Sequence, residues 1–262
     1  MILSNLKSED EVRYTEIDTG VFINRDDVKG KGSFGKVYAG KYIRPGDKQP
    51  IKVAVKLLEK VTLDIKNETE LLSKLSHQFI VKYYTGGYSK KEKKYYIVTE
   101  LCQSDLYTFF KKTADPSTKR LDEHTCALLF HDICMGIKHL HDNDIIHRDI
   151  KMQNILIDDK YNIRIIDFGT SKKLESDDLS TTTYTGTRAY MPYEVLLSAS
   201  PVSYSKEFDI WSLGCLLFKL STGEDYFPKA LMQSADISSI ECKERLKRYF
   251  DREVKYQIGR AH

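Results

Sequence analysis

The alternation of hydrophobic and polar positions changes character partway along this chain. From Val21 to Lys60, apolar residues alternate with polar ones around the turn signal Pro45-Gly46-Asp47, and Tyr95 to Leu101 repeats the alternation, which is typical of β-strands. Between these segments, Val61 to Leu75 has the spacing of a helix. The apolar side of that helix is expected at Ile65, Leu71, Leu72 and Leu75.

After Cys102 the pattern becomes mainly helical. Asp122 to Asp142 predicts an amphipathic helix, and Phe208 to Leu220 predicts a buried one. Asn154 to Ile157 and Ile163 to Ile166 predict two short strands joined by a turn. The positions expected on the apolar side of the long helix are Leu128, Leu129, Ile133, Ile137 and Leu140. The change near Cys102 suggests two lobes rather than two independent domains.

Composition narrows the classes of protein that fit. With 262 residues, 41% hydrophobic and 30% charged, the chain is an ordinary globular protein, and its net charge of +3 and short, mixed lysine clusters argue against nucleic-acid binding. No apolar run approaches the ~18–20 residues that span a bilayer, and Met1 to Asp10 does not resemble a signal peptide. Five cysteines without CxxC spacing favour reduced thiols, hence a cytoplasmic location with the nucleus as the alternative.

A glycine-rich turn is the first candidate for chemistry. Gly30 to Val37 has the spacing G-x-G-x-x-G-x-V, and glycines let a backbone approach phosphates closely. A plain hairpin turn would also fit the glycines alone. A strand pattern continues through Gly40, whereas a dinucleotide-binding fold would continue as a helix, so a hairpin-type phosphate loop fits better.

A lysine on an apolar strand is the second candidate. We interpret Lys56, in Val53 to Lys56, as alternating in phase with core residues, so that it needs a counter-charge or a ligand. Glu68 on the following helix is the expected partner, and Glu70 is the fallback. The alternative is an exposed lysine on an edge strand.

The strongest signal lies in two short loops that combine acidic, basic and amide groups. In His147 to Asn154, Asp149 is placed to orient an incoming hydroxyl, Lys151 to neutralise phosphoryl charge, and Asn154 to bind Mg²⁺ through its oxygen. Asp167 begins Asp-Phe-Gly at the end of an apolar strand, where a carboxylate is suited to hold metal ions against phosphate oxygens.

Two later blocks complete the set of motifs. They run from Gly186 to Glu194 and from Asp209 to Gly214, and we interpret both as mainly architectural, with Trp211 in the core.

Taken in order, these motifs resemble the eukaryotic protein kinase family from about Val21 to Phe227. The resemblance implies an α+β, bilobal protein-kinase-like fold, with a small antiparallel β-sheet lobe and a larger, mainly helical lobe. An N-terminal extension (1–20) would precede a kinase domain (21–262) divided into an N-lobe (21–102) and a C-lobe (103–262) whose end looks incomplete.

The family's ATP and Mg²⁺ follow from the same resemblance. Asn154 and Asp167 would be the metal ligands, Thr99 would be the gatekeeper, and Leu72, His147 and Phe168 would stack in an internal spine. The residues that the resemblance assigns to the nucleotide are Lys29, Gly30, Lys31, Gly32, Ser33, Phe34, Gly35, Val37, Ala54, Lys56, Glu100, Cys102, Leu156 and Asp167.

The resemblance also implies a substrate and a form of regulation. Lys151 and Thr187 match the Ser/Thr-specific pattern, so protein Ser/Thr hydroxyls are the expected acceptors. Arg148 suggests that a phosphate on the activation loop orders it, with Thr183 as the main site and Thr182 as the second, phosphorylated by an upstream kinase or by the chain itself. A flexible Ser/Thr-rich loop is the simpler interpretation.

Three features depart from the family pattern. Lys29 replaces the usual aliphatic residue before the first glycine, and Pro192 is displaced by one position from the usual Ala-Pro-Glu. The sequence after Phe227 offers Glu194 no obvious arginine partner, and an unpaired buried carboxylate would cost several kcal/mol. These departures leave open a pseudokinase or scaffold with the same fold but impaired catalysis.

Overall fold

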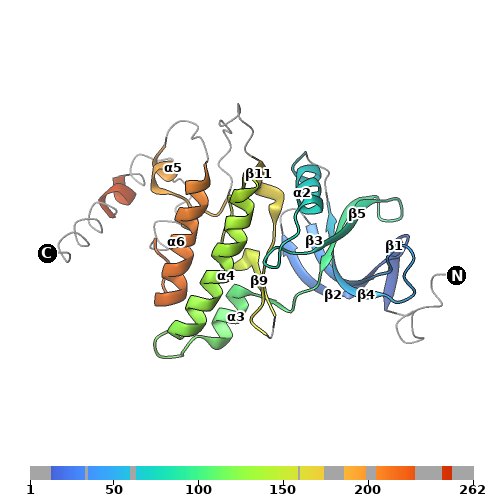
Figure 1. Ribbon diagram of the computed structural model, residues 1–262, viewed down its shortest axis with the longest axis horizontal. Coiled ribbons are helices and arrows are strands. Elements are labelled where there is room, and N and C mark those ends of the chain that lie inside the picture. Colours follow the sequence, from blue (N-terminus) through green and yellow to red (C-terminus); the bar gives the residue numbers. More distant parts are fainter. Residues whose placement is uncertain are drawn as a thin grey trace. The chain divides into compact units, whose positions relative to one another are not determined.

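The computed structural model describes residues 13–32, 35–59, 63–158, 160–173, 186–198, 205–227 and 244–249, without the side chains of residues 63–68 and of Lys172 (Figure 1). The chain divides into two compact units. The first comprises Met1–Ser104 and Leu156–Gly169, and the second comprises Asp105–Ile155 and Thr170–His262.

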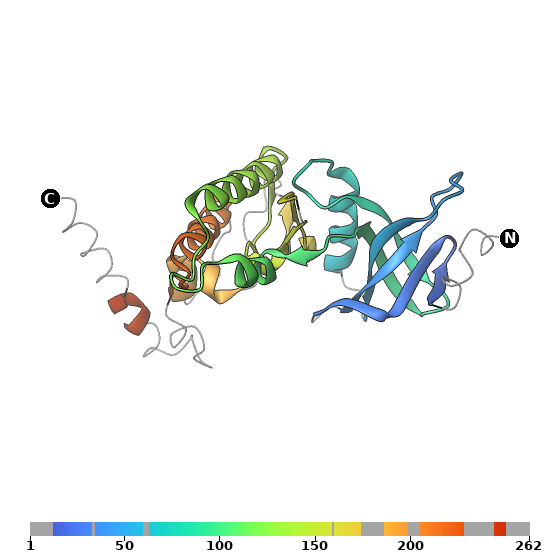
Figure 2. The same cartoon turned by 90° about the horizontal axis from the view of Figure 1, so that it is seen from below.

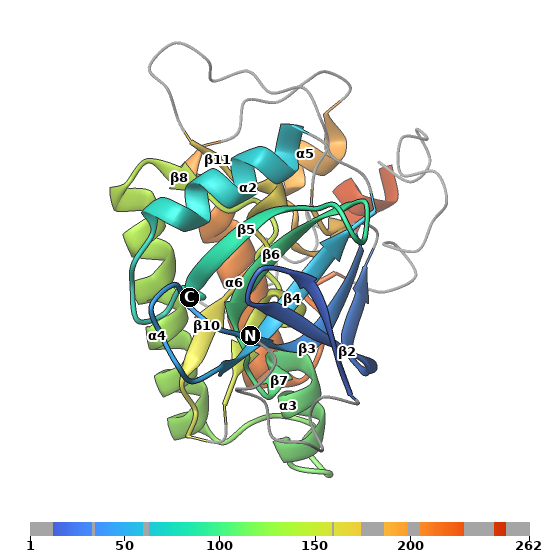
Figure 3. The same cartoon turned by 90° about the vertical axis from the view of Figure 1, so that its right-hand side faces the viewer.

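The first unit is built on a six-stranded antiparallel sheet in the order β1-β2-β3-β4-β6-β5. The helix α2 (Leu63–Lys74) packs against β5, as Figure 3 shows. The strands are β1 (Tyr14–Asp18), β2 (Val21–Gly32), β3 (Gly35–Tyr42), β4 (Ile51–Leu58), β5 (Tyr83–Ser89) and β6 (Lys94–Glu100). The predicted strands and helix of this part are therefore present, whereas β1 was not predicted.

Side chains link β1, at one edge of this sheet, to the hairpin formed by β5 and β6. Tyr96 on β6 donates its hydroxyl hydrogen to Asp18 of β1 at 2.8 Å, and Lys91 forms an ion pair with Glu16 at 3.1 Å. The curled sheet encloses a core made by Ile17, Val21, Ile23, Tyr38, Tyr42, Val53, Val55, Leu57, Tyr96 and Val98. Strand β1 contributes Ile17 to this core, so residues ahead of position 21 are part of the fold.

Two short strands complete the first unit. They are β9 (Ile155–Ile157), which begins at the division between the units, and its neighbour β10 (Ile163–Ile165), joined by a turn as predicted. Ile165 of β10 forms a parallel bridge with Ile80. The 3-10 helix η3 (Phe168–Thr170) follows β10, so Asp167 lies between two ordered elements.

The second unit is mainly helical. Its long helices α4 (Glu123–Asp142) and α6 (Lys206–Thr222) pack side by side, as the yellow-green and orange ribbons of Figure 2 show. The shorter elements are α3 (Leu106–Thr113), α5 (Tyr193–Leu197), η2 (Met152–Asn154), η4 (Arg188–Tyr190) and the paired strands β8 (Ile145–Ile146) and β11 (Lys172–Lys173), while β7 (Ser104–Asp105) lies where the chain passes between units. Residues 244–249 are also helical.

The ends of the two long helices follow ordinary capping chemistry. Asp122 precedes α4 and accepts a hydrogen bond from the Thr125 N–H at 2.9 Å. Gly223 ends α6 at φ +78°, where an added Cβ would lie 2.1 Å from the Lys119 carbonyl oxygen. Only glycine fits that position without strain.

The apolar side of α4 differs from its prediction at one residue. Leu129, Ile133, Ile137 and Leu140 are buried as expected, but Leu128 is 55% exposed. Adjacent helical residues are rotated by about 100°, so Leu128 turns away from the stripe of Leu129. Cys126 and Gly136 complete the buried side instead.

The α+β fold predicted from the resemblance, with an antiparallel sheet part and a mainly helical part, is confirmed. In the part of the chain that the structure describes, no helix is long and apolar enough to cross a membrane. The described cysteines, Cys102, Cys126, Cys134 and Cys215, are free thiols.

Candidate active site

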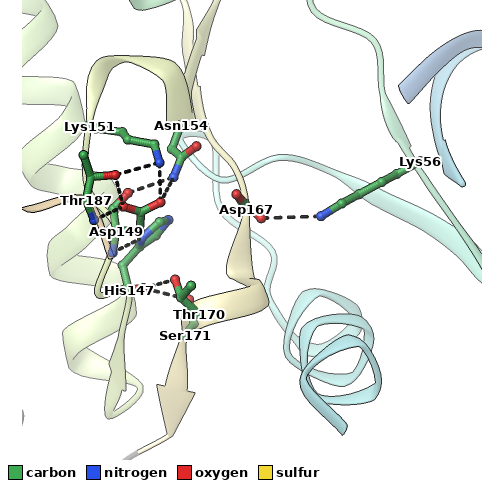
Figure 4. Close-up of polar contacts among 9 residues, drawn as sticks. All are labelled: Lys56, His147, Asp149, Lys151, Asn154, Asp167, Thr170, Ser171 and Thr187. Carbon is green, nitrogen blue, oxygen red and sulfur yellow. Dashed lines mark hydrogen bonds and ion pairs between the residues drawn. The ribbon is translucent and has the colours of Figure 1, made fainter. Parts of the chain in front are cut away.

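Asp149 is the centre of a dense set of hydrogen bonds in the second unit, drawn in Figure 4. Its Oδ2 accepts from Lys151 Nζ at 2.6 Å and from Asn154 Nδ2 at 2.9 Å. Its Oδ1 accepts from the Thr187 N–H at 2.9 Å and from Thr187 Oγ1 at 2.8 Å. The sequence predicted that Asp149, Lys151 and Asn154 act together, and the structure brings them together.

The environment of Asp149 keeps its carboxyl group ionised. Burial of this side chain favours the neutral form, but the hydrogen bond and positive charge of Lys151, the Thr187 hydrogen bond and the field of His147 outweigh burial and hold the pKa of Asp149 below its ordinary value. A buried carboxylate with several donors is a fixed negative charge that can orient a polar hydrogen.

Thr187 is a member of this site whose role the sequence did not reveal. It was recognised only as a mark of Ser/Thr specificity, yet its hydroxyl joins Asp149 to Lys151, because Oγ1 also accepts from Lys151 Nζ at 2.9 Å. The residue lies 38 positions from Asp149 in sequence. The spacing of motifs could not show this contact, although the hydroxyl of Thr187 directly after Gly186 was a usable signal.

The backbone of the proposed catalytic loop (147–154) is held by a second buried carboxylate, that of Asp209 in the first turn of α6. Asp209 accepts from the N–H groups of His147 and Arg148, each at 2.9 Å, and contacts His141 Nε2 at 2.8 Å. Arg148 has φ +65°, a left-handed conformation that is unfavourable by about 1–2 kcal/mol for such a residue. The two backbone bonds to Asp209 offset this strain and fix the loop that carries Asp149.

Asp209 belongs to the motif from Asp209 to Gly214, for which the sequence predicts a mainly architectural role. The contact could have been suspected, because a carboxylate inside an apolar helix requires donors. The donors themselves lie 61 and 62 residues away in sequence.

In the first unit, Lys56 and Asp167 form an ion pair. Lys56 Nζ lies 3.4 Å from Asp167 Oδ1, with side chains 22% and 30% exposed (Figure 4). The prediction that Lys56 needs a counter-charge is thus met by Asp167. Glu68 lies on α2, but its side chain is outside the described residues, so the predicted Lys56–Glu68 pair stays a prediction.

The predicted phase of Lys56 was wrong. Val53, Val55 and Leu57 alternate into the core, which places Lys56 on the opposite face of β4 together with Ala54. Val37 is the register partner of Lys56, and Thr99 is the register partner of Ala54. Because residues directly opposite each other share a face, all of these side chains lie on one face of the sheet.

The glycine turn lies between β2 and β3. Gly35, at φ +151°, packs so closely on β4 that an added Cβ would lie 1.9 Å from the Leu57 carbonyl oxygen, so strand packing alone requires a glycine there. At Gly30 nothing lies within 4 Å of such a Cβ. Lys29, beside it, pairs with Asp27 at 2.8 Å. Ser33 and Phe34 lie outside the described residues.

The remaining first-unit residues assigned to the nucleotide are partly exposed or exposed. Val37, Ala54, Glu100, Cys102 and Leu156 are all partly exposed. Burial, aided by the negative charge of Glu100, raises the pKa of the Cys102 thiol to about 12. This thiol therefore stays protonated, and Cys102 would serve through its backbone. Lys31 is exposed near the end of β2.

The three residues that the resemblance assigns to the internal spine, Leu72, His147 and Phe168, are each buried.

The expectation about Glu194 was wrong. Glu194 lies exposed in the first turn of α5, where the partial positive charge of a helix N-terminus favours a carboxylate. The cost of an unpaired buried charge therefore does not arise. Pro192 directly precedes the helix as its N-cap residue. Thr182 and Thr183 lie outside the described residues.

Comparison with known proteins agrees with this geometry. The family model for the protein kinase domain matches residues 24–260. The chain therefore belongs to the protein kinase family.

Several relatives are named as kinases. Over 201 residues (76% of this chain, 14% of the relative) the chain is 34% identical to mitogen-activated protein kinase kinase kinase 5 of Homo sapiens. It is 33% identical over 203 residues (76% of this chain, 40% of the relative) to the probable serine/threonine-protein kinase glkA of Dictyostelium discoideum. It is 33% identical over 215 residues (78% of this chain, 45% of the relative) to mitogen-activated protein kinase pmk-3 of Caenorhabditis elegans. The chain spans less than half the length of each of these relatives.

Proposed function

We propose that this chain is an ATP-dependent protein serine/threonine kinase, which transfers the γ-phosphate of Mg-ATP to Ser and Thr hydroxyls of protein substrates. The observation that carries the proposal is the buried, ionised Asp149, held by Lys151, Asn154 and Thr187. Use of ATP and a divalent metal ion is general in the family. The names of the relatives support Ser/Thr specificity and a role in signalling.

Asp149 would act on the acceptor hydroxyl. Both carboxylate oxygens of Asp149 already accept hydrogen bonds from protein donors, which fixes their positions. The hydroxyl of a substrate would donate a further hydrogen bond to this carboxylate, or replace one of these donors, and the bond would orient the hydroxyl oxygen for attack. Lys151, paired with Asp149 at 2.6 Å, would neutralise negative charge on the transferring group. The proton of the acceptor would pass to Asp149.

Two residues fit the oxygen ligands that Mg²⁺ prefers. The amide nitrogen of Asn154 donates to both the carbonyl oxygen and Oδ2 of Asp149, which leaves its amide oxygen as the ligand. Asp167 offers a carboxylate, one oxygen of which forms the ion pair with Lys56. When bound, the metal–nucleotide complex supplies the phosphoryl group. Lys56 would bind phosphate oxygens, either alone or with the predicted partner Glu68.

Regulation is part of the proposal. Arg148 Nε donates a short hydrogen bond to the carbonyl oxygen of Thr170. Its guanidinium therefore lies beside the start of the activation loop, the stretch between Gly169 and Gly186. A phosphate on Thr183, or on Thr182, would give this cation a strong partner and order the segment. An upstream kinase or the chain itself would attach the phosphate. A cytoplasmic location fits the free thiols of the described cysteines.

The decisive test is phosphate transfer from labelled ATP to a generic basic protein. We expect Asp149→Ala to lower turnover by ~10²–10⁴, while the control Asp144→Asn, an exposed acid nearby that pairs with Lys206, keeps the wild-type rate. Equal rates for wild type and Asp149→Ala would refute the assignment. No transfer by wild type, together with retained nucleotide binding, would indicate a pseudokinase or scaffold.

Phosphopeptide mapping of active enzyme tests the regulatory part. We expect phosphate on Thr183 and a Thr183→Ala variant of lower activity. Fully active enzyme without phosphate between Ser176 and Thr185 would disprove it.

A further inference from the structure

A polar cluster in the first unit joins β6 to β10 at the point where β6 ends. Glu100, the last residue of β6, accepts two hydrogen bonds on Oε1, from the Lys82 N–H at 2.7 Å and from Arg164 Nε at 3.0 Å. The N–H of Glu100 in turn donates to the Lys82 carbonyl at 2.9 Å. Glu100 and Lys82 therefore bind each other reciprocally, and Arg164 adds a charge to the same oxygen.

The segment before β5 is bonded on its other side to β10. Ile165 donates its N–H to the Phe79 carbonyl at 2.9 Å and accepts from the Val81 N–H at 3.0 Å. Residues 79–82 are thus bonded to Ile165 on one side and to Glu100 on the other, and the Arg164 side chain also binds Glu100. The guanidinium also donates to the Ile163 carbonyl at 2.8 Å, which fixes its orientation.

This cluster, which we call the linker clip (Lys82, Glu100 and Arg164), includes Glu100, one of the residues assigned to the nucleotide, and is close in sequence to two others, Cys102 and Asp167. Arg164 lies on β10, three residues before Asp167, and Glu100 is the first residue of the segment from Glu100 to Cys102, which we call the linker. The Arg164 and Glu100 side chains are only 26% and 23% exposed, so their attraction is less screened than that of a fully exposed pair. The fields of both also act on the Cys102 thiol.

We propose that Arg164 and Glu100 are positioning residues, which fix the Glu100–Cys102 linker for nucleotide binding. The inference rests on the proposed use of ATP. Without the hydrogen bonds of Glu100 to Arg164 and Lys82, the Glu100–Cys102 segment would have to lose conformational freedom when the nucleotide binds. That loss of entropy would weaken nucleotide binding. Chemistry at Asp149, in the other unit, would be unaffected once nucleotide is bound. The clip therefore acts on nucleotide affinity and not on turnover.

The test compares nucleotide binding with turnover in Arg164→Gln and Glu100→Gln. We expect each variant to raise the Kd of a fluorescent ADP analogue and the KM for ATP about two- to fivefold, as loss of one partly screened ion pair allows, with kcat at saturating ATP unchanged. The double variant should be no weaker than either single variant. Arg164→Lys, which keeps the charge but not both hydrogen bonds, should restore part of the affinity.

Lys91→Gln is the matched control, because it breaks the Lys91–Glu16 ion pair of the same unit at 3.1 Å, away from the linker. We expect it to leave Kd and KM unchanged. Unchanged Kd in Arg164→Gln, additive losses in the double variant, or an equal loss in Lys91→Gln would overturn the inference. A wild-type chain that binds no nucleotide would overturn the proposed function as well, which separates the two failures.

Discussion

Replacing Thr187 by valine removes one hydroxyl from the site and keeps the shape of the side chain. That hydroxyl donates to Asp149 Oδ1 at 2.8 Å and accepts from Lys151 Nζ at 2.9 Å, so the change takes one donor from the carboxylate and one acceptor from the ammonium group. The backbone N–H of Thr187 still donates to Asp149. The fold should therefore persist while the alignment of Asp149 and Lys151 loosens.

The size of the effect follows from the kind of bond that is lost. A hydrogen bond to a charged group contributes about 1.5–3 kcal/mol. At 1.36 kcal/mol for each tenfold change in rate, the expected fall in kcat is about ten- to hundredfold. Thr187→Ser keeps the hydroxyl and should stay within a few-fold of wild type.

The pH dependence gives an independent readout. The Thr187 hydrogen bond is one of the causes that hold the pKa of Asp149 below its ordinary value. Its loss raises that pKa, so Asp149 is protonated, and activity lost, at a higher pH than in the wild type. Steady-state rates measured through the acid range, from below the ordinary Asp pKa of 3.8 up to neutral pH, would show the acid limb moving upward in Thr187→Val and not in Thr187→Ser. A valine variant with wild-type kcat and an unmoved acid limb would refute the reasoning.

Three further changes test other parts of the structure. Asp209→Asn places an amide against N–H donors in a buried site and should lower the free energy of unfolding by about 3–5 kcal/mol in urea titration; an unchanged midpoint would contradict the bonding of the catalytic loop to α6. Gly223→Ala should lower Tm by several degrees, because the left-handed φ and the Lys119 carbonyl both reject a Cβ, and Gly46→Ala, with an equally positive φ but open space around it, should cost less. Lys56→Met should leave Tm within a few degrees but abolish most turnover at saturating ATP, and full activity would exclude a role for Lys56 in phosphate binding.

The sequence identified the parts of the site that are local in the chain. Asp149, Lys151 and Asn154 lie within one loop, so their spacing alone placed them together. The predicted start of the long helix at Asp122 likewise agrees with α4, which begins at Glu123, because helix starts depend on residues that are close in sequence. Contacts of this kind join residues that are close in sequence, so they can be predicted without knowledge of the tertiary fold.

The misses have different causes. The face of β4 that carries Lys56 was readable from the alternation, because Lys52 and Ala54 share it while Val53, Val55 and Leu57 occupy the opposite face, so the predicted phase of Lys56 overlooked a local signal. Strand β1 was missed because Glu16 and Asp18 make it polar, and its contacts with the β5–β6 hairpin are remote in sequence. Strand propensity is judged over a few neighbouring residues, so it cannot predict pairings between residues that are remote in sequence.

The contact of Asp209 with the His147 and Arg148 backbone has a consequence for how the protein is made. During synthesis, residues 147–149 leave the ribosome well before α6 exists, so the loop has no carboxylate to hold its left-handed Arg148. The catalytic loop would therefore acquire its geometry late, when α6 folds against α4. A nascent chain that stalls before Lys206 would contain the whole catalytic loop and still lack an organised site, which gives the cell a partly made kinase that cannot act.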